Sequence, residues 1–423
     1  MVFNDIHGTM VVSLLFDLEK GTRPVLDLLR NDDVIQSVKY IRVEYWGDGN
    51  VLVSDEELIT IFGIIGRLPR IKELIIEFDE LPLPAKALRN ALSCSTSRLR
   101  FLALEDVRIS GTLQDFKDVA AAIQQSRSLR AVRLYRCGPA FDSRASLDPI
   151  IAALASVPTL KDITISSTHC SEEVLGMLGE SNSLEVVAMD HMTISGPSLR
   201  QLCQSRSIQD LKFWGMPELD ENATYLTSAL VSNQALKILR IRYCRLHQES
   251  ARLLSDMLYR NSQLESLSLE NVHWKDFGTS LQKSLTSNKS LKSLSLSIDD
   301  KDIDLSSNVA NLTTGLEKNT GLRKFRLLLR EMDGQAVRKA FSKPILDMLQ
   351  NNYTLESIYI NNNSMLDEGM ISILLKLNRT RKRHLLRDEC STKLHFVDML
   401  AAHSADVSIT HYVMSMNPAI FLP

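Results

Sequence analysis

The sequence predicts an α/β solenoid in which parallel strands line one face and helices cover the other. The first observation is an apolar pattern that recurs through most of the chain. The second is helix-length apolar periodicity between successive copies of that pattern. The third is the composition of the 423 residues, 44% hydrophobic and 24% charged, which is ordinary for a folded protein.

The repeated pattern reads apolar-x-x-apolar-x-apolar, as in Leu264, Leu267 and Leu269. Twelve copies begin at Val38, Ile71, Leu99, Leu129, Leu160, Leu184, Ile208, Leu236, Leu264, Leu291, Leu322 and Leu355. From the first start to the last, (355 − 38)/11 gives a mean period of about 29 residues. All 36 pattern positions (12 × 3) are Leu, Ile, Val, Phe or Met, which chance placement does not explain.

Each copy is preceded by a segment with apolar residues spaced three and four apart, such as 251–258 and 226–230. Each repeat is therefore a strand followed by a helix, and strands joined through helices run parallel. Parallel strands lie about 4.8 Å apart, whereas packed helices need about 8 to 10 Å. The stack is expected to curve into a horseshoe with strands on the concave face and helices on the convex face.

Two kinds of residue mark the ends of the predicted helices. Ser54 and Glu57 have the spacing of a capping box at a helix start. In the five late units an Asn stands three residues before the first strand Leu, at Asn233, Asn261, Asn288, Asn319 and Asn352. Because Asn tolerates the left-handed conformation, we expect these residues to end the helices in that conformation.

The units resemble leucine-rich repeats of the ribonuclease-inhibitor type. The consensus L-x-x-L-x-L-x-x-N/C matches 129–137, 236–244 and 355–363, and the resemblance covers about residues 38–363. It implies twelve repeats in one horseshoe, with Cys137 and Cys244 pointing inward at the ninth position. Other units have different residues at that position, so the turn there is expected to be less regular.

The two ends are predicted to cap the solenoid, because a repeat array exposes an apolar face at each end. Residues 1–37 are expected to form an N-terminal cap with short amphipathic helices around 10–18 and 24–29. Residues 364–423 are expected to form a helical C-terminal cap, with helices over 368–386, 396–402 and 409–416.

Charge and motif content exclude several classes of function. Lys and Arg number 49 and Asp and Glu 51, so bulk charge favours neither nucleic acid nor a membrane surface as a partner. No export signal or bilayer-spanning run is present, which indicates a cytoplasmic protein. The basic run 379–387 fits a solvated cap face, with a nuclear-import signal, and so the nucleus, as the alternative. No phosphate-binding glycine loop occurs, so no nucleotide cofactor is expected.

Candidate catalytic and metal-binding groups favour structural interpretations. Cys137 and Cys244 are interpreted as small core residues. Cys170 stands beside His169, but Ser171 reads as the N-cap of a helix at 172–177. The tail histidines 395, 403 and 411 are too far apart for one metal ion, and the acidic loop 299–304 lacks the calcium-loop pattern. The sequence therefore predicts no enzyme, no cofactor and no metal site.

The concave face is the remaining candidate for function. Within each strand, the fifth and seventh positions of the pattern point away from the core. The central units place a basic and aromatic set there, namely Arg133, Tyr135, Lys212, Trp214, Arg240 and Arg242. Earlier strands carry Glu77 and Glu105, and later ones carry serines. This surface fits recognition of an acidic protein partner, but neutralisation of the cations by Asp162, Asp190 and Asp210 on the same face is an equal alternative.

The leading hypothesis is a non-enzymatic scaffold that binds a folded protein on this concave face. Similar repeats also occur in GTPase-activating proteins and in substrate receptors of ubiquitin ligases, which gives a second hypothesis. A third is the sensing segment of an immune-type receptor. The identity of a captured partner discriminates among the three.

Overall fold

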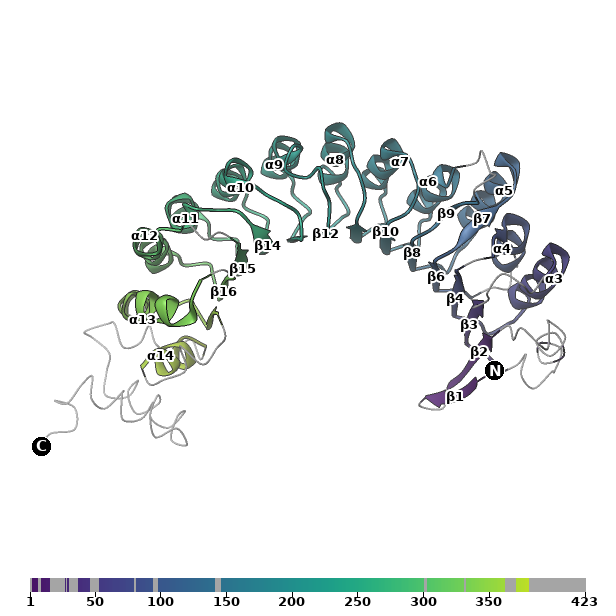
Figure 1. Cartoon of the computed structure of the whole chain (residues 1–423), viewed down its shortest axis with the longest axis horizontal. Helices are drawn as coiled ribbons and strands as arrows, with labels where there is room; N and C mark the ends of the chain where they lie inside the picture. Colours follow the sequence, from purple (N-terminus) through teal and green to yellow (C-terminus); the bar gives the residue numbers. More distant parts are fainter. Residues whose placement is uncertain are drawn as a thin grey trace, which may run out of the picture. The chain divides into compact units, whose positions relative to one another are not determined.

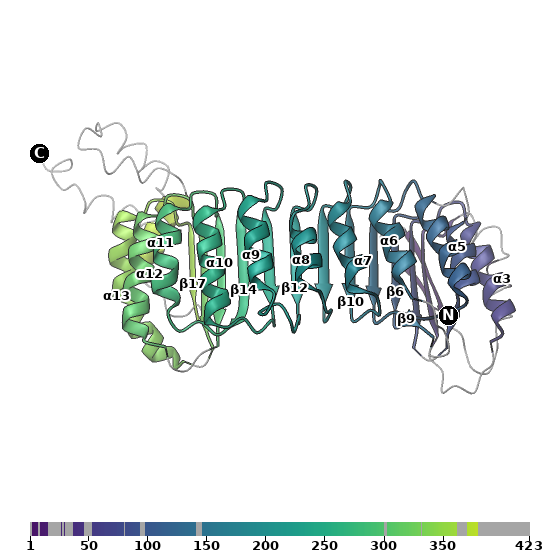
Figure 2. The same cartoon turned by 90° about the horizontal axis from the view of Figure 1, so that it is seen from above.

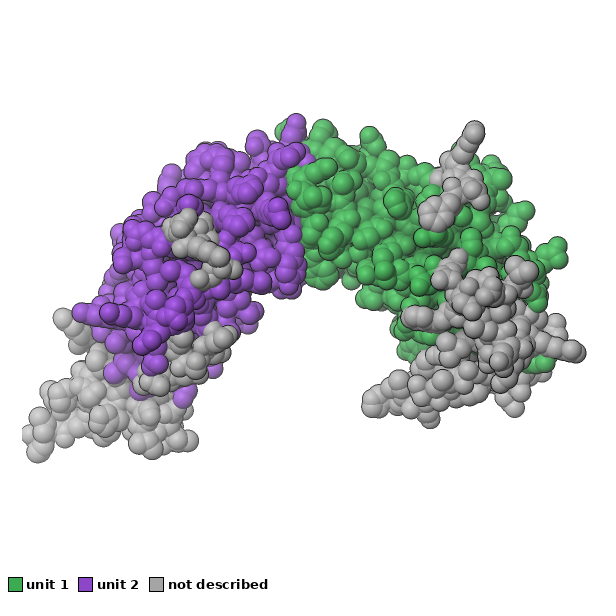
Figure 3. Space-filling model, viewed as in Figure 1, with its two compact units in different colours: residues 1–218, 233–236 green, residues 219–232, 237–423 purple. Residues whose placement is uncertain are grey.

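The computed structural model of the chain describes residues 2–6, 9–15, 27, 29, 37–45, 53–79, 81–93, 98–140, 146–299, 303–330, 332–361 and 370–379. The chain forms two compact units (Figure 3). Unit 1 comprises Met1–Glu218 with Asn233–Leu236, and unit 2 comprises Leu219–Ser232 with Lys237–Pro423.

Unit 1 alternates strands and helices. Its elements are β1 (Val2–Ile6), β2 (Thr9–Leu15), β3 (Tyr40–Tyr45), α3 (Asp55–Gly66), β4 (Glu73–Phe78), β5 (Leu83–Pro84), α4 (Ala85–Leu92), β6 (Phe101–Glu105), β7 (Arg108–Ser110), α5 (Leu113–Gln124), β8 (Ala131–Tyr135), β9 (Gly138–Pro139), α6 (Asp148–Ser156), β10 (Asp162–Ser166), α7 (Glu172–Met177), a 3-10 turn (Leu178–Glu180), β11 (Val186–Asp190), α8 (Gly196–Cys203) and β12 (Asp210–Trp214). From β2 to β12 the main-sheet strands pair in parallel, while β5, β7 and β9 form a separate three-stranded parallel sheet.

Unit 2 continues the alternation. Its elements are α9 (Ala223–Ser232), β13 (Ile238–Arg242), α10 (Gln248–Arg260), β14 (Ser266–Val272), α11 (Phe277–Ser287), β15 (Ser293–Ile298), α12 (Leu305–Lys318), β16 (Lys324–Leu329), α13 (Gly334–Asn351), β17 (Ser357–Ile360) and α14 (Met370–Arg379). The strands β13 to β17 pair in parallel in chain order. Within each unit the strands lie on one side and the helices on the other, as Figures 1 and 2 show. The chain is therefore the predicted α/β leucine-rich-repeat solenoid.

The repeated apolar pattern forms the core of both units. All 36 pattern positions are buried, and the most accessible of them, Ile358, exposes 8% of its surface. Strands show the matching alternation, with Val132 and Leu134 buried and the residues between them accessible in β8. Removal of these side chains from water is the main stabilising contribution to each repeat, and it needs only alternate strand positions. The strand positions between these apolar residues are not required for the core.

The ninth repeat position is also buried where the sequence places a cysteine. Cys137 exposes 1% and Cys244 none of its surface, and both thiols are free. The Cys137 thiol donates a hydrogen bond to the Leu104 carbonyl at 3.2 Å. The predicted inward orientation of both residues is confirmed.

The N-terminal prediction is wrong over residues 10–15. These residues belong to β2, which pairs in parallel with β3, and β1 pairs antiparallel with β2 at the sheet edge. The β-branched residues Val11 and Val12 favour a strand, and the open edge of β3 supplies the hydrogen-bond partners. Of the second predicted helix, over 24–29, only Asp27 and Leu29 are described, and both are helical.

The predicted left-handed helix ends are also wrong. Asn261, Asn288 and Asn319 do end helices, but their φ values of −78°, −75° and −75° are those of extended backbone. Their side chains stabilise the turn instead, through hydrogen bonds to the backbone. The Asn288 amide nitrogen donates to the carbonyls of Leu258 (2.7 Å) and Asn261 (2.9 Å), and its oxygen accepts from the Leu291 N–H (2.8 Å). Each amide thus ties one repeat to the preceding one.

The capping box at Ser54 is confirmed, because Ser54 and Glu57 exchange both hydrogen bonds at the start of α3. Of the predicted C-terminal cap, α14 is described and falls within the expected first helix. The other two expected helices and the cap role of both termini lie outside the described residues and stay predictions.

Candidate functional site

The candidate site is the strand face of each unit, which we define as the surface formed by the accessible side chains at alternate positions of the main-sheet strands. Arg133 and Tyr135 are exposed at these positions of β8. Lys212 and Trp214 occupy them on β12, and Arg240 and Arg242 on β13, all four half-buried. The predicted orientation of all six residues is confirmed, while their role in binding stays a prediction.

In unit 1 the predicted cations meet carboxylates of the same face. Arg133 lies 3.7 Å from Glu105, and Lys212 lies 3.6 Å from Asp210. The Arg133 guanidinium also stands 5.9 Å from the centre of the Phe101 ring. Asp210 therefore neutralises Lys212, as the alternative expected, whereas the ion-pair partner of Arg133 is Glu105 and not one of the three aspartates that the alternative named.

A row of three glutamates runs across the first strands of unit 1. Glu44, Glu77 and Glu105 are consecutive register partners on β3, β4 and β6. Like charges on neighbouring strands repel. Arg42 offsets part of this repulsion, since it pairs with Glu44 and donates to Glu77 at 2.6 Å. The hydrogen bond to Glu77 raises the pKa of the Arg42 guanidinium. Sequence reasoning found Glu77 and Glu105 but missed Glu44 and Arg42, which share the same repeat positions.

Burial affects two carboxyl groups of this unit. Burial raises the pKa of Asp162, against the opposing attraction of Lys212. Burial also raises the pKa of Asp106, although Arg136 bonds to it at 2.6 Å and opposes the rise. The Arg136 guanidinium covers the Tyr135 ring at 4.8 Å, so Tyr135 sits at the edge of an ion pair.

The residue that follows each strand was not identified from the sequence. Seven described non-glycine residues have positive φ, and they are Asp106, Arg136, Ser167, His191, Tyr243, Asn271 and Asn361. Most occupy the eighth repeat position, where the chain leaves the sheet. A left-handed backbone is unusual for a tyrosine, yet Tyr243 has φ 55° and exposes 59% of its surface. The strand ends therefore form an accessible rim beside the strand face.

Unit 2 arranges its charges differently. Arg242 lies 3.0 Å from Glu270 on the next strand. The serines expected on the later strands are present on the face of β14 and β15. Beyond them, Lys324 and Arg326 are exposed on β16, a pair that sequence reasoning did not consider. Of the residues singled out from the sequence, Arg240 and Arg242 belong to unit 2, and the other four belong to unit 1.

The cysteine and histidine candidates sit in structural positions. Burial raises the pKa of Cys170 to about 12, and burial raises that of Cys137 to about 12, which opposes thiolate formation at neutral pH. Ser171 precedes α7 as predicted, but its side chain makes no capping bond, and its N–H donates to Asp148 at 2.7 Å instead. Within the described ranges, no three His, Cys, Asp or Glu side chains are grouped to hold a metal ion. The tail histidines lie outside those ranges.

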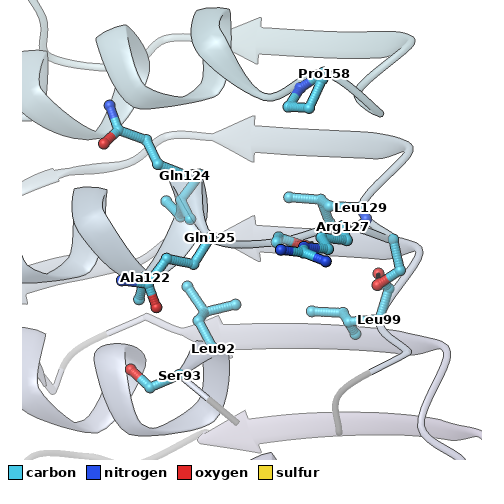
Figure 4. Close-up of a pocket in the computed structure, with 12 residues that line it drawn as sticks. Leu92, Ser93, Leu99, Ala122, Gln124, Gln125, Arg127, Leu129 and Pro158 are labelled. Carbon is cyan, nitrogen blue, oxygen red and sulfur yellow. Dashed lines mark hydrogen bonds between the residues drawn. The ribbon is translucent and has the colours of Figure 1, made fainter. Parts of the chain in front are cut away.

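A cavity of about 650 Å³ in unit 1 lies at the C-terminal ends of α4 and α5 (Figure 4). Leu92, Ala122 and Leu129 line its apolar side, and Gln125 and Arg127 its polar side. It holds one charged side chain and no acid–base pair among its lining residues. Residues 94–97, which follow this edge of α4, lie outside the described residues.

Comparisons with known proteins give distant structural likeness. No protein-family model and no curated protein sequence matches this chain. A structure titled leiomodin-1 actin-binding site 2 is similar with a TM-score of 0.28 and 15% identity, covering 44% of this chain and 91% of that one. A TLR13–ssRNA13 complex is similar with a TM-score of 0.38 and 14% identity, covering 82% and 54%.

A Bacteroides fragilis protein is similar with a TM-score of 0.35 and 15% identity, covering 69% of this chain and 74% of that one. The assignment of the fold rests on the repeat register and the paired strands described above. Among the helices that are described, none is long and apolar enough to cross a bilayer.

Proposed function

We propose that this chain is a non-enzymatic scaffold of the ribonuclease-inhibitor-like repeat type that binds a folded protein partner on its strand face. One observation carries the proposal. The repeat needs only alternate strand positions for its core, and at positions between them β8, β12 and β13 hold large charged and aromatic side chains, namely Arg133, Tyr135, Lys212, Trp214, Arg240 and Arg242. Arginine, tyrosine and tryptophan are the side chains most enriched at protein interfaces.

Trp214 supports this proposal in unit 1. Its indole nitrogen is buried and has no hydrogen-bond partner among the described residues. Buried polar atoms are normally paired, and an unpaired one is costly. Rotation of the half-buried indole toward a partner that supplies an acceptor would remove this cost, so Trp214 is the residue of unit 1 for which we expect the greatest contribution to binding.

The proposal is tested by affinity capture from cell extract followed by mass spectrometry. We expect Trp214→Ala to reduce capture of the main partner at least tenfold, and Arg240→Glu with Arg242→Glu to abolish it. Lys339→Glu with Lys343→Glu, which reverses two exposed cations on α13, is the matched control and should capture normally. Equal capture by all variants would place binding elsewhere. A captured adaptor or small GTPase would favour the receptor or activating role instead.

A further inference from the structure

The strand face of unit 2 contains a trough of small hydroxyl side chains. β14 and β15 offer six strand-face positions, of which five are serines and the sixth is Glu270. The serines are Ser266, Ser293 and Ser295, which are partly accessible, and Ser268 and Ser297, which expose 8% and 1% of their surface. They lie in register, with Ser266 beside Ser293 and Ser268 beside Ser295. Serine is among the shortest polar side chains, so this part of the face is low and rich in hydrogen-bond donors.

Longer cationic side chains border the trough on both sides. Arg240 on β13 is the register partner of Ser268, and on β16 Lys324 and Arg326 are the partners of Ser293 and Ser295. Arg330 follows β16 and donates to the Ser297 hydroxyl at 2.9 Å. The backbones of β13 and β16 are three strand spacings apart, about 14 Å. This width accommodates one extended polypeptide with its side chains.

The cations of β16 lack a balancing carboxylate on their own strand and on β15. The six strand-face positions of β15 and β16 carry two cations, Lys324 and Arg326, and no carboxylate. Lys324 lies between Ser293 and Ser357, and Arg326 between Ser295 and Tyr359. Neither side chain forms an ion pair with a described residue, and Arg326 instead covers the Tyr359 ring at 4.9 Å. In this respect they differ from Arg133, Lys212 and Arg242, each of which has a carboxylate within 4 Å.

We infer that this trough binds an extended acidic segment of the protein partner, with Asp or Glu carboxylates held by Lys324 and Arg326. The inference rests on the proposed function and names the chemistry of its partner. Hydrogen bonds between a carboxylate and a cation are about twice as strong as neutral ones, and the serine hydroxyls can donate to the remaining oxygens. The segment would lie over β14 and β15, where the small side chains leave room for it.

The test uses the full chain and a fluorescein-labelled peptide of ten glutamates, with binding followed by fluorescence anisotropy at two salt concentrations. Lys324→Glu with Arg326→Glu is expected to weaken binding at least tenfold. Ser295→Glu, which places a negative charge on the trough floor, is expected to weaken it comparably. Lys339→Glu with Lys343→Glu on α13 makes the same charge change away from the face and should stay within twofold of wild type. Binding should weaken as salt rises.

Two outcomes overturn the inference. One is equal loss in the α13 control and in the β16 variant, which would show that only net charge matters. The other is much tighter binding of a phosphoserine peptide or a thymidine oligonucleotide, with glutamate binding undetectable. If Lys324→Glu with Arg326→Glu does not fold, as judged by circular dichroism, Lys324→Gln with Arg326→Gln replaces it with the same expectation of direction.

Capture from cell extract separates this inference from the proposed function. If wild type captures a partner and the β16 variant captures it equally well, the trough inference fails while the scaffold proposal stands. If wild type captures no partner, the scaffold proposal fails, and the peptide measurements still decide whether the trough holds acidic chains.

Discussion

The two units close the same turn, from helix end to strand start, with partly different side chains. In unit 2 a single asparagine side chain makes the hydrogen bonds that close this turn. Asn319 donates to the carbonyls of Leu285 (2.5 Å) and Asn288 (3.0 Å) and accepts from the Leu322 N–H (2.6 Å). In unit 1 Asn233 makes the same bridge, to the carbonyls of Cys203 and Ser205 and from the Leu236 N–H. In other repeats of unit 1 the equivalent position is serine, and two side chains share these hydrogen bonds.

Two repeats of unit 1 use a pair of serines. The Ser181 hydroxyl accepts from the N–H groups of Ser183 (3.3 Å) and Leu184 (3.4 Å), and the Ser183 hydroxyl donates to the Val157 carbonyl (2.7 Å). Ser205 and Ser207 make the same hydrogen bonds in the next repeat, which also belongs to unit 1. An amide has its donor and acceptor on separate atoms and can bridge two repeats alone, whereas a hydroxyl is too short to do both. The bridge between repeats can therefore be made by one asparagine or by two serines.

The largest expected effect is on the amide bridge. Asn288→Ala leaves the buried Leu258 and Asn261 carbonyls and the Leu291 N–H without their partner. Each unpaired buried group costs free energy, so we expect the free energy of unfolding to fall by about 2 to 4 kcal/mol. Urea unfolding followed by circular dichroism measures it. A loss below about 0.5 kcal/mol would mean that the bridge is dispensable.

A smaller effect is expected for half of the serine bridge. Ser181→Ala removes two long hydrogen bonds to backbone N–H groups and leaves the Ser183 contact to Val157 in place. We expect a loss of about 1 kcal/mol, within the usual range for one hydrogen bond. The same urea titration applies. If Ser181→Ala costs as much as Asn288→Ala, the division of the task between two serines is wrong.

The smallest effect concerns a charge on the strand face of unit 1, where unit 2 has serines. Burial raises the pKa of Asp162 above its ordinary 3.8, so ionised Asp162 is disfavoured in the folded chain relative to the unfolded chain. This penalty applies above the folded pKa and disappears as the pH falls through it. Asp162→Asn should therefore raise the melting temperature slightly at pH 7 and leave it unchanged near pH 3. Thermal melts at both values check the sign, and a decrease at pH 7 would contradict it.

The strand faces of the two units also differ in how their cations are paired. In unit 1 the cations Arg133 and Lys212 have carboxylate partners on the same face. In unit 2 the exposed Lys324 and Arg326 are bordered by serines and a tyrosine. The basic residues singled out from the sequence were those clustered in the central strands, whereas Lys324 and Arg326 on β16 form no ion pair with a described residue. Counting charges along the chain could not find this, because pairing depends on the residues of the neighbouring strands.

The sequence alone determined the repeat register and the side of each strand that faces the core. Both follow from local periodicity, since a strand alternates its side chains whatever lies beside it. Only the tertiary structure decided that residues 10–15 form a strand, because the edge of β3 supplies its partners. It also decided that Asn288 bridges two repeats with an extended backbone, and that Lys324 has no carboxylate beside it. These properties depend on residues about 30 positions away, and short-range patterns carry no information on which atoms of adjacent repeats come within hydrogen-bonding distance.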